Sequence, residues 1–120
     1  MELNLIGLNH KTAPIEIREK FVFSHDMLSH VLKDLKLKTG AEALILSTCN
    51  RTEIYFRVKE PNEIYQWLAT FNNIKFTELK KYLYSLTKKD CYIHACKVAS
   101  GLDSMLIGET QIFGQMKQAS

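Results

Sequence analysis

Residues 43–58 read ALILSTCNRTEIYFRV, two hydrophobic segments separated by a short polar stretch. The first segment, Ala43 to Leu46, is continuously apolar, as expected of a strand that is buried on both faces. In the second, two sets of side chains alternate, which is typical of a strand. The apolar set is Ile54, Phe56 and Val58, and the more polar set is Glu53, Tyr55 and Arg57. We therefore predict that the two strands pair as a hairpin around the polar stretch.

The polar stretch contains Cys49, directly after the buried strand. Because the strand is packed in the core, the residue that follows it has a fixed position, while the loop leaves its thiol accessible. Arg51 is a nearby cation that favours a thiolate or binds an anionic substrate, and Thr48 and Asn50 offer donors to a developing oxyanion. Cys49 is therefore a candidate nucleophile, with a buried structural thiol as the alternative, because free cysteines are often buried.

Outward from the hairpin, hydrophobic spacing predicts two further strands and two helices. Ser24 is a suitable N-cap for a helix that ends at Gly40, and Pro61 begins a second helix that ends at Asn72. Strands are expected near residues 3–8 and 82–86. The order β-α-β-β-α-β predicts an α+β fold, a ferredoxin-like sandwich with two helices on one face of an antiparallel sheet.

Residues 87–120 are expected to form a helical appendage to that sandwich, which itself spans residues 1–86. A helix begins near Thr87 and carries Cys91 and His94, a break follows at Gly108, and a terminal helix runs to Ser120. The last helix stops without a cap or tail, which suggests a fragment of a longer protein.

Composition sets broad limits. A chain of 120 residues with 46% hydrophobic content is one domain in length, and a net charge of +3 is only mildly basic. Three cysteines and no apolar leader favour reduced thiols and a cytoplasmic location. No stretch approaches the roughly 20 apolar residues of a membrane span, so we expect a soluble protein.

His94 is the leading candidate for a general acid or base, because its reference pKa lies near neutrality and a thiol nucleophile is often partnered by a histidine distant in sequence. The alternative is a helix histidine bonded to a backbone carbonyl, and His10, in a loop, competes for the same role. Cys91 and His94 share a helix face at i, i+3, but no second pair at ligand spacing accompanies them, so we predict no metal site.

The sequence contains no G-x-G-x-x-G after a strand and no Walker pattern. A complete nucleotide-binding unit is therefore not expected in this chain, and any hydride donor must bind elsewhere.

Three segments together resemble the N-terminal catalytic domain of glutamyl-tRNA reductase: GLNHKTAP at 7–14, LSTCNRTEIY at 46–55 and ASGLDSMLIGETQI at 99–112. The resemblance spans almost the whole chain. It implies reduction of the glutamate esterified to tRNA(Glu) to glutamate-1-semialdehyde with NADPH, the first step of the five-carbon route to tetrapyrroles.

By this resemblance Cys49 is the nucleophile that forms a glutamyl thioester, and His94 is the histidine important for activity. The residues implied in binding the glutamyl group are Thr48, Asn50, Arg51, Ser104, Glu109, Thr110, Gln111 and Gln115. We expect the substrate's ammonium to suit Glu109 and its side-chain carboxylate to suit Arg51.

The resemblance also implies partners outside this chain. The family continues into an NADPH-binding Rossmann domain and a helical dimerisation domain, so a homodimer and hand-over of product to glutamate-1-semialdehyde aminotransferase are expected of the full-length protein, while this fragment alone should not reduce its substrate. Two alternatives remain open. One is a non-enzymatic RNA- or protein-binding α/β module that uses a lysine stripe on the first helix, and the other is a cysteine hydrolase that needs no hydride.

Overall fold

The computed structural model describes residues 2–48, 50–100 and 106–109. Within these residues five strands form one sheet in the order β4-β1-β3-β2-β5, and every neighbouring pair is antiparallel. The α+β class with an antiparallel sheet is confirmed. The strands are β1 (Asn4–Asn9), β2 (Glu42–Ser47), β3 (Arg51–Arg57), β4 (Tyr84–Thr87) and β5 (Leu106–Glu109).

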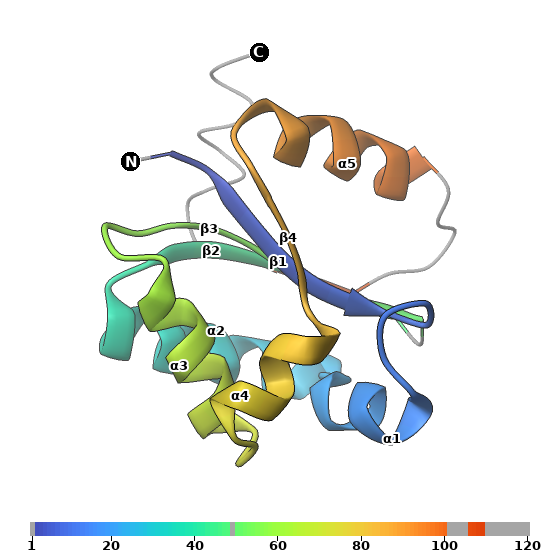
Figure 1. Cartoon of the computed structure of the whole chain (residues 1–120). Coiled ribbons are helices and arrows are strands. Elements are labelled where there is room, and N and C mark those ends of the chain that lie inside the picture. The colour runs from blue at the N-terminus through green and yellow to red at the C-terminus, as the bar shows by residue number, and fades with distance from the viewer. Residues whose placement is uncertain (1, 49, 101–105, 110–120) are drawn as a thin grey trace.

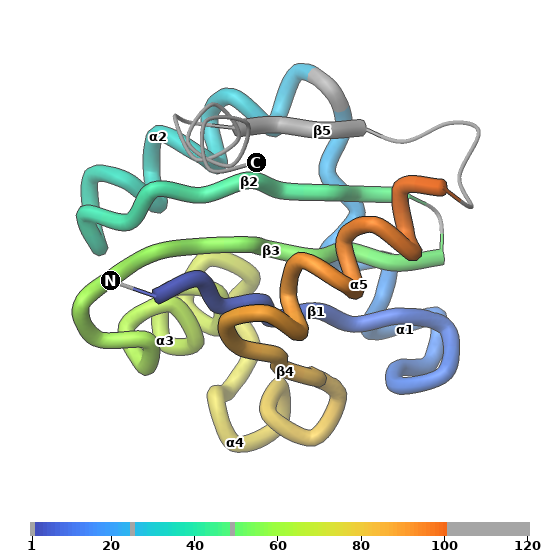
Figure 2. The backbone as a smooth tube through the Cα atoms, turned by 90° about the horizontal axis from the view of Figure 1, so that it is seen from above, coloured from blue at the N-terminus to red at the C-terminus, as the bar shows by residue number. Residues whose placement is uncertain are grey.

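Helices cover both faces of the sheet (Figure 1). One face carries α1 (Ile15–Arg18), η1 (Glu19–Phe21), α2 (His25–Thr39), α3 (Asn62–Phe71), α4 (Phe76–Leu79) and η2 (Lys80–Tyr82). The other face is crossed by α5 (Lys89–Ser100), and Figure 2 shows this helix running over β1 and β3.

Two hydrophobic cores result, one on each face. The larger lies under α2 and α3 and includes Ile6, Ile45 and Phe56. The smaller lies under α5 and consists of Leu3, Leu5, Leu44, Leu46, Tyr55, Cys91 and Val98. Because both faces are covered, a polar side chain on either face of the central strands is buried unless it lies at a strand end.

The boundaries of α2 confirm the predicted capping. Ser24 accepts a hydrogen bond on Oγ from the Met27 backbone N–H at 3.3 Å, and Gly40 ends the helix at φ 75°, a conformation that glycine adopts without the Cβ penalty. The predicted helix after Pro61 is also present, since α3 begins at Asn62 and ends at Phe71.

The predicted hairpin is confirmed and is firmly anchored. β2 and β3 pair from Glu42↔Arg57 to Ser47↔Thr52, which leaves residues 48–50 as the connection. On the α2 face, Thr52 Oγ1–H donates to the Phe21 carbonyl at 2.8 Å, and the Phe23 N–H lies 3.5 Å from Ser47 Oγ. These bonds fix the end of the hairpin against η1 and the segment that follows it.

The helical extension predicted for residues 87–120 needs correction. Its first helix is present as α5, but residues 106–109, expected to be a break and the start of the terminal helix, form β5 and pair with β2 from Leu106↔Ser47 to Glu109↔Leu44. The expected terminal helix otherwise falls at 110–120, outside the described residues. Within the described ranges, none of the helices combines the length and apolar character needed to cross a membrane.

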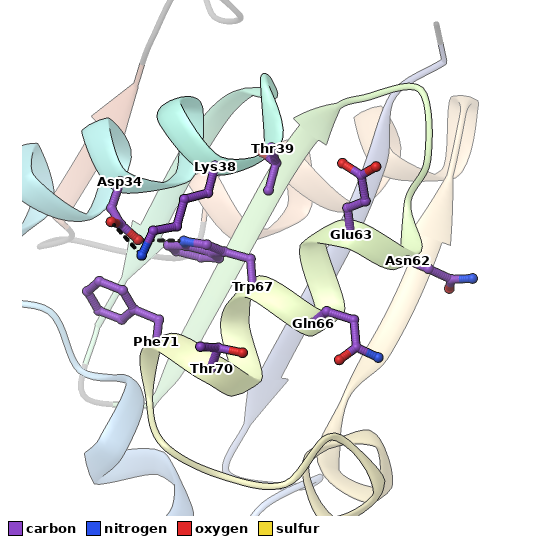
Figure 3. Close-up of a pocket in the computed structure, with 9 residues that line it drawn as sticks. All are labelled: Asp34, Lys38, Thr39, Asn62, Glu63, Gln66, Trp67, Thr70 and Phe71. Atoms are coloured by element: carbon purple, nitrogen blue, oxygen red, sulfur yellow. Dashed lines mark hydrogen bonds and ion pairs between the residues drawn. The ribbon is translucent and has the colours of Figure 1, made fainter.

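An open pocket of about 730 Å³ lies between α2 and α3, on the face opposite α5 (Figure 3). At one end the Trp67 indole N–H donates to Asp34 Oδ2 at 2.8 Å, and Lys38 Nζ lies 3.2 Å from Asp34 Oδ1. The Trp67 hydrogen bond, with a smaller effect of Lys38, holds the pKa of Asp34 below its ordinary value. Asp34 therefore ties the two helices together as a carboxylate.

We expect Asp34→Asn to lower the free energy of unfolding at neutral pH by about 1 kcal/mol, because the charge-assisted bond to Trp67 weakens. A folded-state pKa below the unfolded value gives stability that is present above the unfolded pKa and is lost as pH falls through the folded pKa. The deficit of the variant should thus be full above about pH 5 and shrink on acidification. Urea unfolding at several pH values tests this, and a deficit that grows toward low pH would contradict it.

Candidate active site

The chain on either side of Cys49 forms a tight hydrogen-bonded turn. The Thr48 N–H donates to the Arg51 carbonyl at 2.8 Å, and Thr48 Oγ1 accepts from the Asn50 and Arg51 N–H groups, each at 3.2 Å. Cys49 itself lies outside the described residues. Since Thr48 uses its oxygen as an acceptor, its hydroxyl hydrogen is left to donate, in line with the predicted role near an oxyanion.

The loop after β1 packs against this turn. Asn9 Oδ1 accepts from the Lys11 and Thr12 N–H groups at 2.9 and 3.1 Å, a turn that reverses the chain. The His10 N–H donates to the Asn50 carbonyl at 3.0 Å, while the His10 side chain is exposed. The backbone of His10 thus holds this residue beside the Cys49 loop.

Glu53 is the centre of the site, although no sequence pattern predicted a role for it. Its side chain is 0% exposed and accepts from four donors: the Tyr84 hydroxyl at 2.6 Å, the Tyr55 hydroxyl at 3.0 Å, Arg51 Nη1 at 3.4 Å and His94 Nε2 at 2.5 Å. A buried carboxylate without partners would cost several kcal/mol, so this set of donors is what makes the position tolerable.

His94 reaches the carboxylate from above the sheet. It lies in the middle of α5, and its Nε2–H donates to Glu53 Oε2, because a carboxylate can only accept. The partner is thus a carboxylate, and not the backbone carbonyl of the alternative interpretation. Among the described residues none bonds to Nδ1, so that nitrogen is the one left for proton transfer, and the ring is held in a defined orientation.

Arg51 stands between Glu53 and the Cys49 loop. Its side chain is 22% exposed, and one N–H group engages Glu53. A guanidinium has five N–H donors, so this bond orients the group and leaves donors for an anionic ligand. The predicted role of Arg51 toward a carboxylate is compatible with the geometry.

The two tyrosines are hydrogen-bond donors over the whole physiological range. Burial, with the neighbouring Glu53 carboxylate, raises the pKa of Tyr84 and of Tyr55 well above the usual value for a phenol. Both hydroxyls therefore stay protonated and donate to Glu53, and the cluster holds its negative charge on the carboxylate alone.

The predicted site residues fall into three sets. Thr48, Asn50, Arg51 and His94 lie at the same end of the sheet on or near β3. Glu109 lies on β5 opposite Leu44, three residues or roughly 10 Å from the pair at Ser47. The remaining predicted residues fall outside the described part of the chain: Cys49, Ser104, Thr110, Gln111 and Gln115.

Neither of the two described cysteines belongs to this cluster. Cys91 is fully buried, donates weakly to the Leu3 carbonyl and has a pKa raised to about 11 by burial and by Asp90, whereas Cys96 is exposed. Within the described residues no group of three His, Cys, Asp or Glu side chains is placed to hold a metal ion.

Alkylation should separate the thiols. With iodoacetamide near neutral pH we expect Cys49 to react fastest, Cys96 at an ordinary rate, and Cys91 at least about a hundredfold more slowly than Cys96 because little thiolate forms. Peptide mapping after timed quenching measures the three rates, and a denatured sample is the control in which Cys91 becomes reactive. Equal rates at Cys49 and Cys96 would contradict an activated Cys49.

Comparison with known proteins shows the family to which the chain belongs. The family model described as "Glutamyl-tRNAGlu reductase, N-terminal domain" matches residues 6–120. The chain belongs to the glutamyl-tRNA reductase family. Over 120 residues, 99% of this chain, it is 51% identical to the glutamyl-tRNA reductase of Thiobacillus denitrificans, 49% to that of Nitrosomonas europaea and 48% to that of Neisseria gonorrhoeae.

The chain spans 29% of the length of each of these glutamyl-tRNA reductases. The resemblance drawn from three sequence segments is thereby confirmed at the level of the family and of its N-terminal domain. The matched region includes the Cys49 loop, Glu53 and His94.

Proposed function

We propose that this chain is the acyl-transfer domain of a glutamyl-tRNA reductase, in which Cys49 takes the glutamyl group from glutamyl-tRNA(Glu). The observation that carries the proposal is the pairing of His94 with buried Glu53 beside the Cys49 loop, together with membership of the family. In fold terms, the order β4-β1-β3-β2 with antiparallel neighbours supports a ferredoxin-like sandwich spanning residues 1–86, with 87–120 as an extension.

The first step is attack on the ester. The Cys49 thiolate adds to the aminoacyl carbonyl, and the hydroxyl hydrogen of Thr48 and the amide of Asn50 stabilise the oxyanion. Arg51, oriented by Glu53, holds the side-chain carboxylate of the glutamyl group.

Collapse of the tetrahedral adduct forms the thioester. The bond from the carbonyl carbon to the terminal ribose oxygen breaks, and that oxygen receives from Nδ1 of His94 the proton that this nitrogen took from the Cys49 thiol, while Nε2–H stays on Glu53. The buried carboxylate stabilises the ring when it is charged and holds one tautomer when it is neutral, so the same nitrogen faces the reacting atoms in each cycle.

Glu109, Ser104, Thr110, Gln111 and Gln115 complete the proposed glutamyl pocket. Glu109 enters this set only as a proposal for the substrate ammonium, since its backbone lies roughly 10 Å along β5 from Ser47.

Reduction of the thioester is proposed for the longer family members, in which NADPH supplies the hydride. The described residues do not form a site for that cofactor, because dinucleotide sites of the Rossmann type lie at the carboxyl ends of parallel strands, and every described strand pair is antiparallel. We therefore assign to this chain only the steps up to the thioester. A homodimer and transfer of glutamate-1-semialdehyde to its aminotransferase are likewise proposed for the full-length protein.

The test is to mix the chain with glutamyl-tRNA(Glu) and follow intact mass. A glutamyl adduct that maps to Cys49 and is released by hydroxylamine supports the proposal, and Cys96→Ser serves as the control that should keep it. Release of free glutamate without an adduct would favour the cysteine hydrolase, and binding of tRNA without either product would favour the non-enzymatic module.

A further inference from the structure

Tyr84 contributes to the site from an edge strand, on the far side of β1 from Glu53. In the sheet register Gly7 stands opposite both Tyr84 on β4 and Glu53 on β3, so the tyrosine side chain must cross Gly7 to reach the carboxylate. A Cβ atom at Gly7 would lie 2.8 Å from Tyr84 Cζ, 2.9 Å from its hydroxyl oxygen and 3.0 Å from Glu53 Cγ. Glycine at this position is therefore what admits the phenol.

Tyr84 and His94 share one oxygen of the carboxylate. The Tyr84 hydroxyl lies 2.6 Å and His94 Nε2 2.5 Å from Glu53 Oε2, whereas the Tyr55 hydroxyl bonds Oε1 at 3.0 Å. Both phenols donate to one carboxylate, but of the two only Tyr84 bonds the oxygen that His94 bonds, an oxygen that also accepts from Arg51 Nη1 at 3.4 Å.

We propose that Tyr84 is a positioning residue of the thiol site: its hydroxyl, admitted over Gly7, holds Glu53 Oε2 and limits how strongly the carboxylate retains a proton on His94. The role of His94 as proton carrier rests on the proposed function, but the influence of Tyr84 on His94 does not.

The physical basis is the division of charge at Oε2. A carboxylate stabilises a protonated imidazole, and a second donor on the same oxygen draws charge away and weakens that stabilisation. Because burial and Glu53 keep the pKa of Tyr84 far above neutrality, the phenol acts as a donor throughout the range in which a histidine titrates.

Charged and titratable groups face His94 from neighbouring elements and from its own helix, and each variant considered replaces at most one of them. Glu53, Arg51 and Tyr55 face it from β3, and Tyr84 from β4. Its own helix carries Asp90 one turn before it and Lys97 one turn after it.

The decisive variant is Tyr84→Phe, which removes the hydroxyl and keeps the ring that packs over Gly7. We expect the titration midpoint of the His94 ring, followed by NMR in the chain and assigned from its loss in His94→Gln, to rise by about half a unit to one unit. Tyr55→Phe should produce a smaller rise, since that hydroxyl bonds Oε1. Tyr92→Phe is the matched control without a shift, because the Tyr92 hydroxyl accepts from Arg57 at 3.2 Å and not from this cluster.

A His94 midpoint in Tyr84→Phe that equals that of Tyr92→Phe, or that falls, would overturn the proposal. Gly7→Ala should reproduce the rise by displacing the phenol. If Gly7→Ala does not fold, Tyr84→Phe alone decides, because its ring still fills the same space.

A second readout keeps this inference apart from the proposed function. The pH profile of glutamyl transfer to the chain should move in Tyr84→Phe in the same direction as the His94 midpoint. A midpoint that moves while the rate profile stays fixed counts against acid-base catalysis by His94 and leaves the coupling of Tyr84 to His94 intact. A fixed midpoint overturns the coupling, whatever the transfer rate.

Discussion

Replacing Cys49 by serine should slow glutamyl transfer from glutamyl-tRNA(Glu) to the chain by at least about 10³-fold. A thiol ionises near pH 8.5, whereas an alcohol stays protonated in the same loop, and His94 is the only described imidazole bound to a buried carboxylate there. The turn itself is held by backbone and Thr48 hydrogen bonds, so the fold should be unchanged.

The measurement is single-turnover adduct formation by intact mass, with thermal unfolding as the check on the fold. Cys96→Ser is the matched control, because it removes an exposed thiol on α5 and should leave the rate unaltered. An adduct that persists in Cys49→Ser, or reductase turnover that survives in the same variant of a full-length family member, would refute the covalent route.

Replacing His94 by alanine should slow acyl transfer by roughly 10² to 10⁴, the usual range for loss of a general acid or base. A second effect accompanies it, because Glu53 would lose its closest nitrogen donor and keep only Arg51 and the two tyrosines. We therefore expect a measurable loss of stability together with the loss of rate.

The two effects can be separated. His94→Gln retains a donor toward Glu53 and should recover stability without recovering the rate. His10→Ala is the competing variant, since His10 flanks the Cys49 loop through its backbone. Normal thioester formation in His94→Ala combined with a slow reaction in His10→Ala would transfer the proton-carrying role to His10.

Local signals in the sequence predicted much of this fold. Ser24 and Gly40 delimit α2 because capping and a left-handed residue act within one turn of the chain, and the hairpin around Cys49 needs only two adjacent strands with a short connection. The pairing of β5 with β2 was missed because it joins residues about 60 positions apart, and a four-residue strand lacks the length for a clear period.

Glu53 was missed for a different reason. Alternation on β3 assigns Glu53 and Tyr55 to the polar side of the strand. In a sheet with only one covered face, that side would be exposed to solvent. Here α5 covers that face, and the same residues become buried. The sequence of β1 did indicate that both faces of the sheet are covered. Its side chains are apolar on both faces, with Leu5 on one and Ile6 and Leu8 on the other.

The strand β3 carries site and core on alternate residues, with Arg51, Glu53 and Tyr55 on one face and Thr52, Ile54 and Phe56 on the other. Inserting or deleting a single residue in the connection 48–50 without a compensating bulge would turn the strand over and exchange the two sets. The length of this connection is therefore constrained together with its site residues, and natural insertions in homologous chains should be found in other loops.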